Sequence, residues 1–174
     1  MAKTLAILGA TLAAYIPALS CGYIWDDDLW LLTRKLDSLS DLAPYWFLPG
    51  HFPQYYPLVH TSFFLEEKLW GLSPAGFHAV NILLHGLCAV LIWRVLLRLR
   101  VPGAYLCGLL FALHPMCVES VAWVTERKNV LSGVFFFASI LGWTHFFGLD
   151  GKPSEHRPLW WFAGFALFVC AVLS

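Results

Sequence analysis

The sequence predicts an all-α fold, a polytopic bundle of transmembrane helices with short interfacial helices in a long first outer loop. Three observations lead to this fold class. Hydrophobic residues make up 59% of the 174 residues and charged residues 13%, against about 25% charged in average soluble proteins. Apolar runs of membrane-spanning length recur along the chain. An aromatic-rich stretch separates the first run from the second. A soluble domain of this length could not bury so much apolar surface, so lipid must be the solvent for much of it.

Five apolar segments are expected to be helices. They cover approximately residues 4–22, 76–97, 101–118, 129–148 and 159–174. A spanning helix needs about 20 residues, and the last segment is still apolar at Ser174. We therefore expect residues 1–174 to be the N-terminal part of a longer membrane domain. The first run could alternatively be a cleaved signal peptide, but the later apolar segments favour an uncleaved anchor.

The basic residues predict a cytoplasmic N-terminus, because short cytoplasmic loops carry an excess of Lys and Arg. Arg98 and Arg100 lie in the turn between the second and third segments, and Lys152 lies in the loop before the fifth. With these loops inside, the long loop at 23–75 and the loop near 119–128 face the non-cytoplasmic side.

The first outer loop, residues 23–75, has the density of aromatic residues that is typical of a membrane interface. Its stretch DSLSDLAPYWF begins with capping residues and predicts a short helix near 37–46, with Pro44 in the first turn. Pro57 and Gly71 mark the start and the end of a second predicted helix. Both helices are expected to lie flat on the outer leaflet.

Three consecutive carboxylates, Asp26, Asp27 and Asp28, follow the first apolar segment. Adjacent carboxylates repel one another near a low-dielectric surface, so their clustering needs a cation, a substrate or a hydrogen-bond network to compensate. One of them could act as a general base, and two could hold a divalent metal through oxygen ligands. A solvated turn that merely ends the helix is an equal alternative.

A second polar stretch, HPMCVESVAWVTERKN at residues 114–129, is expected on the same outer side. Pro115 should break or kink the third helix. Glu119 could orient an acceptor or a metal, and Arg127 and Lys128 could bind a phosphate, Arg as a fork and Lys as a point charge. A kinked helix end with solvated charges is the alternative.

In the second segment, His78, Asn81 and His85 share one helical face. Interhelical hydrogen bonding is the favoured interpretation of this face, ahead of a direct role in a site. Two histidines without a third ligand are a weak indication of a metal, and the five cysteines show no CxxC or CxxH spacing. A formal net charge of zero gives no indication of nucleic-acid binding.

Three blocks resemble a known family in order and spacing. They are WDDD after the first helix, QYYPLVHTSFFLEEKLWGLSPAGFHAVNILLH at 54–85 and LLFALHPMCVESVAWVTERKNVLS at 109–132. Together they resemble the bacterial relatives of the transmembrane and tetratricopeptide-repeat O-mannosyltransferases, over nearly the whole chain. The resemblance implies a GT-C type membrane glycosyltransferase of the bacterial inner membrane. Such an enzyme moves a sugar, mannose or a similar hexose, from a polyprenyl-phosphate donor on the non-cytoplasmic side to a hydroxyl of a protein Ser or Thr or of a glycan.

The resemblance also implies roles for individual residues. Asp27 is the expected base, with Asp26 or Asp28 as close alternatives, and Glu119 is the acid of the motif after the third helix. Arg127 and Lys128 are expected to bind the donor phosphate. The remaining candidates for substrate contact or packing are Tyr56, His78, Asn81, His85, His114 and Glu126. No cofactor or metal ligand is assigned, membrane lipids are expected partners, and these residues alone are expected to be inactive without the rest of the protein.

Two other functions stay open on the sequence. A transporter or flippase of lipid-linked solutes would use polar residues near the bilayer midplane, such as His78, Asn81 and His85. A non-enzymatic membrane anchor for a tetratricopeptide-repeat domain would tolerate replacement of the Asp triplet.

Overall fold

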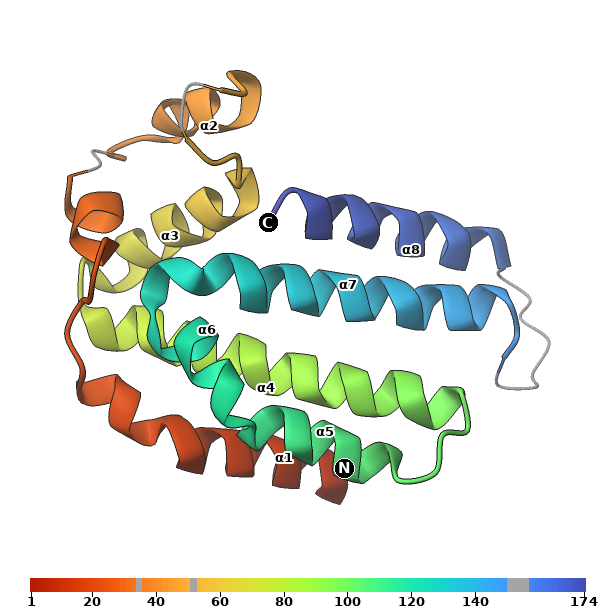
Figure 1. Ribbon diagram of the computed structural model, residues 1–174. Helices are drawn as coiled ribbons and strands as arrows, with labels where there is room; N and C mark the ends of the chain where they lie inside the picture. Colours follow the sequence, from red (N-terminus) through yellow and green to blue (C-terminus); the bar gives the residue numbers. More distant parts are fainter. Residues whose placement is uncertain (34–35, 51–52, 150–156) are drawn as a thin grey trace.

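The computed structural model describes residues 1–33, 36–50, 53–149 and 157–174, and within these ranges the chain consists of helices and the segments that join them (Figure 1). The predicted all-α fold is confirmed. Among the described residues, three helices are long and apolar enough to cross a membrane, or four if one bent pair is counted as a single span. These candidate spans indicate an integral membrane protein.

Five helices form the bundle. They are α1 (Ala2–Tyr15), which a 3-10 turn extends to Ser20, α4 (Pro74–Arg98), α5 (Ala104–Leu113), α7 (Arg127–Phe146) and α8 (Arg157–Val172). α4 is the central helix, because it packs against α1, α5 and α7. Its Ala89 and Trp93 pack with Ile7 of α1 and Ala112 of α5 in one apolar cluster. The four predicted segments after the first therefore each contain a helix, and the third is interrupted.

The third segment is broken at the predicted proline. α5 ends at Leu113, Pro115 begins a short 3-10 turn, and α6 (Val118–Ala122) follows at a bend of 52°. Pro115 has no backbone N–H to continue the helix, which explains the break. The bend leads the chain across the end of the bundle to the start of α7 (Figure 1).

α7 and α8 run antiparallel and approach each other closely. A Cβ atom built on Gly142 would lie 3.3 Å from the Cα atom of Gly164. At the same contact the Ser139 hydroxyl donates a hydrogen bond to the carbonyl oxygen of Gly164, at 2.7 Å. Small residues that let two backbones approach, with a hydroxyl bonded across the contact, are typical of helix pairs in membranes.

Two short helices lie in the region predicted to be the first outer loop. They are α2 (Ala43–Phe47), preceded by a 3-10 turn at Leu39–Leu42, and α3 (Pro57–Trp70). Ser38 and Asp41 cap the 3-10 turn through reciprocal hydrogen bonds. Pro44 lies in the first turn of α2, and Gly71 ends α3 with a φ of +65°. Both helices lie close to the predicted ranges, and their placement on the membrane surface stays a prediction.

One turn between α1 and α2 was not predicted. Residues Asp28–Leu32 form a single π-type turn, and Trp25, just before it, adopts a left-handed φ of +51°. The Trp25 ring packs edge-on against Trp123, with ring centroids 4.5 Å apart. A bulky residue rarely adopts this backbone conformation, and π-type turns recur at functional sites. Asp26 and Asp27, which lie between Trp25 and the π-type turn, are therefore candidate site residues.

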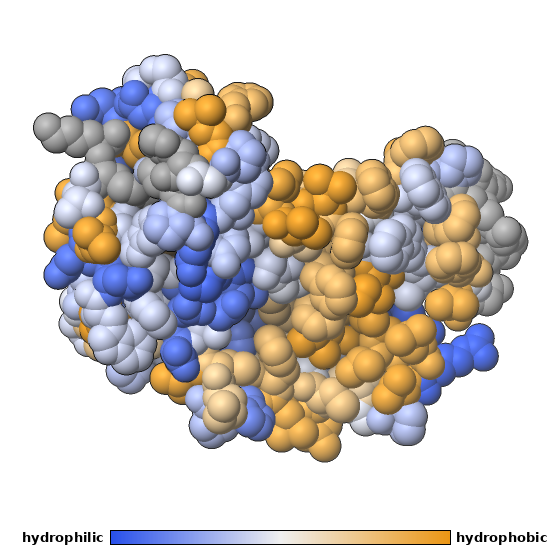
Figure 2. All heavy atoms as spheres, turned by 45° about the horizontal axis from the view of Figure 1, so that its top comes forward, coloured by the Kyte–Doolittle hydropathy of each residue, from blue (hydrophilic) through white to orange (hydrophobic). Residues whose placement is uncertain are grey.

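The polar elements gather at one end of the bundle. Figure 1 shows α2, α3, α6 and the start of α7 at this end, and the turn between α4 and α5 at the other. In Figure 2, apolar side chains cover much of the bundle, while hydrophilic residues gather at the end with α2 and α3. Arg98 and Arg100 lie at the opposite end, and Lys152 lies outside the described residues. The direction in which the chain crosses the membrane stays a prediction.

Candidate functional site

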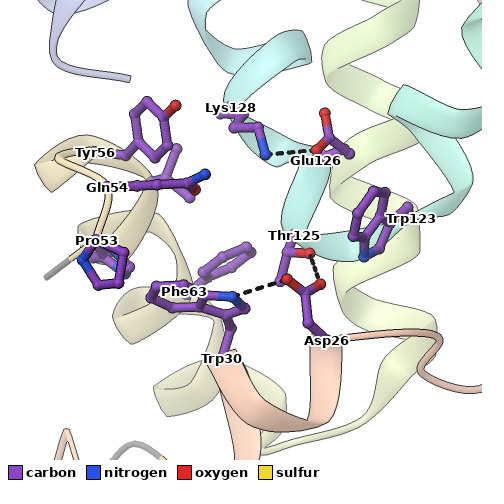
Figure 3. A pocket seen from close by; sticks show the side chains of 12 residues that line it. Asp26, Trp30, Pro53, Gln54, Tyr56, Phe63, Trp123, Thr125, Glu126 and Lys128 are labelled. Carbon is purple, nitrogen blue, oxygen red and sulfur yellow. Dashed lines mark hydrogen bonds and ion pairs between the residues drawn. The ribbon is translucent and has the colours of Figure 1, made fainter.

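A cavity of about 310 Å³ lies at the polar end, between α3, the turn after the Asp triplet and the start of α7 (Figure 3). Its polar lining residues are Asp26, Gln54, His60, Thr125, Glu126 and Lys128. Its aromatic lining residues are Trp30, Tyr56, Phe63 and Trp123. A concave site with aromatic walls and a few convergent polar groups is typical of a small-molecule site.

Asp26 is the member of the triplet that lines this cavity, and it is half-buried. One of its carboxylate oxygens accepts a hydrogen bond from the indole N–H of Trp30, at 3.0 Å. The other accepts from the hydroxyl of Thr125, at 3.2 Å. Two donors from different elements therefore fix the plane of the carboxylate at the cavity wall (Figure 3).

Asp27 has no exposed surface and does not line the cavity. Its Oδ2 atom accepts from the backbone N–H of Ile24, at 3.1 Å, and its Oδ1 atom accepts from the backbone N–H of Thr125, at 2.9 Å. Asp27 thus fastens the segment after α1 to the segment before α7. Asp28 is exposed at the start of the π-type turn. The three neighbours in sequence therefore occupy three different environments.

The pKa of a neighbouring tyrosine, Tyr23, is raised to about 12. Burial is the main cause, and the negative charges of Asp27 and Asp28 contribute in the same direction. The Tyr23 hydroxyl donates a hydrogen bond to the carbonyl oxygen of Leu72, at 3.0 Å. The phenol is therefore a neutral donor that ties the triplet region to the loop before α4.

Lys128 and Glu126 face the cavity from the start of α7. The Nζ atom of Lys128 lies 2.5 Å from Oε1 of Glu126. It also lies 5.9 Å from the ring centroid of Tyr56 and 5.9 Å from that of Trp123. Within the part of the chain that the structure describes, α7 begins without a side-chain cap. The N-terminal end of a 20-residue helix, with its partial positive charge, therefore adjoins the cavity beside a lysine.

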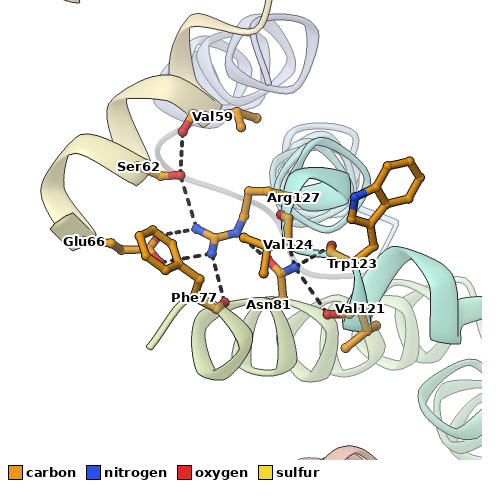
Figure 4. Close-up of polar contacts among 9 residues, drawn as sticks. All are labelled: Val59, Ser62, Glu66, Phe77, Asn81, Val121, Trp123, Val124 and Arg127. Carbon is orange, nitrogen blue, oxygen red and sulfur yellow. Dashed lines mark hydrogen bonds and ion pairs between the residues drawn. The ribbon is translucent and has the colours of Figure 1, made fainter. Parts of the chain in front are cut away.

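Arg127 is turned away from the cavity into the core (Figure 4). Its guanidinium pairs with both carboxylate oxygens of Glu66 on α3 and donates to the side chain of Asn81 on α4. It also donates to the Ser62 hydroxyl at 3.2 Å and to the Phe77 carbonyl oxygen at 3.1 Å. Burial raises the pKa of Glu66, while the guanidinium of Arg127 acts in the opposite sense. Arg127, which was expected to bind the donor phosphate, is thus part of a buried network that joins α3, α4 and α7.

Asn81 belongs to the same network. Its carboxamide N–H₂ group lies within hydrogen-bond distance of three carbonyl oxygens, those of Val121, Trp123 and Val124, at 3.1–3.4 Å. The Asn81 side chain of α4 therefore contacts the segment that leads from α6 to α7, in addition to the backbone hydrogen bonds that the carbonyl groups of Trp123 and Val124 accept (Figure 4).

The two histidines of the same face are also buried between elements. The Nε2 atom of His78 lies 3.4 Å from the Gly22 carbonyl oxygen, and that of His85 lies 3.2 Å from the Ala112 carbonyl oxygen. In the described part of the chain, Nδ1 of His78 is buried with no hydrogen-bond partner. These contacts join α4 to α5 and to the segment that follows α1, as expected for hydrogen bonding between elements of the bundle.

Glu119 and His114 lie elsewhere. Glu119 is exposed on α6, and His114 is exposed at the break, where its Nδ1 atom accepts from the Met116 N–H at 3.2 Å. Neither residue lines the cavity. The structure therefore brings Asp26, Lys128 and Glu126 together on one cavity with Tyr56, and places Asp28, Glu119 and His114 outside it.

Sequence reasoning missed four residues of this region. Trp30 and Thr125 orient Asp26, Gln54 lines the cavity, and Glu66 neutralises Arg127. A signal for Glu66 was present, because it stands at helical spacing from Val59 and Phe63 and so belongs to the buried face of α3. Thr125 gave no such signal, since its partners lie almost 100 residues away in sequence. Among the described residues, no three His, Cys, Asp or Glu side chains are grouped as a metal site.

Comparison with known proteins relates the chain to one group. It is 30% identical over 185 residues to the protein O-mannosyl-transferase TMTC3 of Homo sapiens, a match that covers 97% of this chain. It is 31% identical to TMTC2 of Mus musculus over 94% of this chain, and 34% identical to TMTC4 of Homo sapiens over 80%. The chain is a distant homologue of the TMTC protein O-mannosyl-transferases.

This homology to the TMTC proteins covers only part of them. The chain spans about a fifth of the length of these curated relatives, 19% of human TMTC3 and 20% of mouse TMTC2. No protein-family model matches the chain. No solved structure matches it either. The relation to the TMTC proteins is confirmed at this level, and a bacterial origin stays a prediction.

Proposed function

We propose that this chain forms the catalytic end of an integral membrane glycosyltransferase that transfers a hexose from a polyprenyl phosphate to a hydroxyl acceptor. One observation carries the proposal: a carboxylate, Asp26, and an ammonium group, Lys128, line the same aromatic cavity at the polar end of the bundle. The homologues support it, because they are named protein O-mannosyl-transferases. Mannose or a similar hexose is then the sugar, and a protein Ser or Thr is the acceptor.

In this proposal Asp26 is the general base. Its carboxylate takes the proton of the acceptor hydroxyl, and the hydroxyl oxygen forms a bond to the anomeric carbon. The bond from that carbon to the phosphate oxygen breaks, and the phosphate leaves with the electron pair. Asp27, the base expected from the resemblance, acts here through Thr125, because Asp27 holds the Thr125 backbone while the Thr125 hydroxyl holds Asp26.

The departing phosphate gathers negative charge, so positive groups beside it lower the barrier. Lys128 supplies a charge at the cavity wall, and the N-terminus of α7 adds the positive end of a helix dipole. Arg127 contributes at a distance, by fixing the start of α7 against α3. A volume of about 310 Å³ is at the lower end of the range for ligand pockets. It therefore fits the sugar phosphate, with the lipid chain outside the cavity.

The same proposal places the cavity on the non-cytoplasmic side, with lipid-linked sugar and acceptor arriving there. The basic residues at the opposite end, Arg98 and Arg100, support this orientation.

The test uses the full-length protein in membranes with a radiolabelled polyprenyl-phosphate sugar and a pool of acceptor proteins. Asp26→Asn and Asp27→Asn are compared with the exposed control Asp37→Asn at matched amounts of folded protein. Asp26→Asn should lower transfer at least about 100-fold, and the comparison at matched amounts of folded protein separates this loss from any destabilisation caused by replacing one of the two acceptor oxygens. Wild-type transfer by Asp26→Asn would reject Asp26 as the base, and loss confined to Asp27→Asn would assign that role to Asp27. Absence of transfer by the unmodified protein with every sugar tried would reject the glycosyltransferase.

A further inference from the structure

The ammonium group of Lys128 lies between two aromatic rings at the cavity wall. Its distances to the ring centroids of Tyr56 and Trp123 are equal, 5.9 Å, and 24% of its side chain is exposed. Both rings are within the range of a cation–π attraction, so they attract the ammonium group to this point. Lys128 also lies in the first turn of α7, where a helix favours a bound anion.

Glu126 already provides a negative charge at this position. One carboxylate oxygen pairs with Lys128, and the other accepts a hydrogen bond from the Asn129 side chain. Asn129 also donates to the Ser120 hydroxyl, at 3.1 Å. The Glu126 side chain is 12% exposed, so this pair is less hydrated than an ion pair on an open surface.

A purely structural role for Glu126 would not require its contact with Lys128. A carboxylate just before α7 stabilises the positive end of the helix whether or not it touches Lys128. The bond from Asn129 to one oxygen satisfies that role. The second oxygen, which points to Lys128 in the cavity (Figure 3), is not needed for it.

We propose that Glu126 is an internal counter-anion, which pairs with Lys128 until a phosphate-bearing ligand replaces it. This inference rests on the proposed function, because the phosphate is that of the sugar donor. On binding, phosphate oxygens take the place of Oε1 of Glu126 at the ammonium group, while Asn129 keeps Oε2. Glu126 therefore sets the affinity of the cavity for phosphate, and removing its charge should make phosphate bind more tightly.

The experiment measures dissociation constants of the purified full-length protein by calorimetry. The probes are inorganic phosphate, farnesyl phosphate and, as an uncharged reference, farnesol. Glu126→Gln keeps the size of the side chain and an oxygen for Asn129, and Glu126→Ala serves if the first variant does not fold. Glu67→Gln is the matched control, because Glu67 is a half-buried carboxyl group on α3 that does not line the cavity. Lys128→Met and the double variant with Glu126→Gln complete a cycle.

Glu126→Gln should lower the dissociation constant for phosphate about two- to tenfold, with farnesol binding and the Glu67→Gln control unchanged. The gain should disappear in the Lys128→Met background. If Glu126→Gln binds both phosphates more tightly to the same degree, the phosphate group alone replaces Glu126. If only farnesyl phosphate binds more tightly, the replacing ligand is a lipid-linked phosphate. Both results support the inference. Unchanged or weaker phosphate binding by Glu126→Gln, or a gain that persists without Lys128, would overturn it.

Binding and transfer are measured separately, so the two proposals fail separately. Tighter phosphate binding by Glu126→Gln in a protein that transfers no sugar would support the counter-anion and reject the transferase. Sugar transfer by a protein whose Glu126→Gln variant binds phosphate as the wild type does would reject the counter-anion alone.

Discussion

Arg127 and Glu66 form a two-pronged ion pair in the core of the polar end, with none of the arginine side chain and 7% of the glutamate side chain exposed. The pair joins α7 to α3 (Figure 4), and residues at the starts of both helices line the cavity (Figure 3). It therefore sets the distance between Lys128 on one wall and Tyr56 and His60 on the other. Its removal should affect the shape of the cavity as well as the stability of the fold.

Glu66→Ala should lower the free energy of unfolding by about 3–5 kcal/mol, because it leaves a buried guanidinium without its counter-charge. Thermal and denaturant unfolding in detergent micelles would measure this loss. The double variant Glu66→Leu with Arg127→Met removes both charges and should regain most of the stability. A Glu66→Ala protein as stable as the wild type would contradict a buried pair.

Asp27→Asn should lower the free energy of unfolding by about 1–3 kcal/mol. A carboxamide has one acceptor oxygen, whereas Asp27 accepts from two backbone N–H groups, those of Ile24 and Thr125. One of these groups would face the N–H₂ group of the new side chain and lose its partner. The exposed neighbour offers the comparison: Asp28→Asn should change stability by less than about 0.5 kcal/mol. Equal effects of the two substitutions would be evidence against the different environments of Asp27 and Asp28.

Gly164→Ala should separate α7 from α8 or displace the Trp143 ring. The new Cβ atom would lie 2.5 Å from Cδ1 of Trp143, which is too close for two carbon atoms. We expect a loss of about 1–3 kcal/mol, as for other overpacked contacts. Gly9→Ala in α1 is the matched control, because nothing lies within 4 Å of its Cβ position, and it should leave stability unchanged or raise it. The stabilities of both variants are measured as unfolding temperatures in the same detergent. If Gly9→Ala lost as much stability as Gly164→Ala, this would contradict the close contact between Gly164 and Trp143.

The cap of the 3-10 turn at Leu39–Leu42 should depend on pH. Hydrogen bonds from the Ser38 backbone and hydroxyl hold the pKa of Asp41 below its usual value. Since the folded pKa is the lower one, the stabilisation is fully present above the unfolded value, about pH 4, and is lost as the pH falls through the lowered folded pKa. A carboxyl-carbon NMR titration would measure this, and Ser38→Ala should move the pKa of Asp41 back upward. A pKa of Asp41 at or above about 4 in the unmodified protein would contradict the cap.

Local sequence signals were sufficient for the helices, because their ends depend on residues nearby in the chain. Pro57 and Gly71 delimit α3, and Pro115 breaks the third segment, each through the backbone chemistry of one residue. The π-type turn at Asp28–Leu32 had no comparable signal.

The candidate site was predicted less well, because its geometry depends on long-range partners. Asp26 and Asp27 are equivalent in the sequence, but Asp27 is fully buried and Asp26 is half-buried at the cavity, and Thr125, from a distant segment, donates a hydrogen bond to each. Arg127 and Lys128 are likewise adjacent, yet successive residues of a helix point about 100° apart, so one enters the core and the other the cavity. Sequence reasoning singled out both segments, but it could not tell which member of each pair would face the cavity.

The bend after α5 divides the chain before α7 into short helical turns. A single carboxamide, that of Asn81, joins these turns to α4 through the carbonyl groups of Val121, Trp123 and Val124. Trp123 is also a wall of the cavity, whereas Asn81 never reaches it. The position of this wall therefore depends on a residue of α4 that lies outside the cavity.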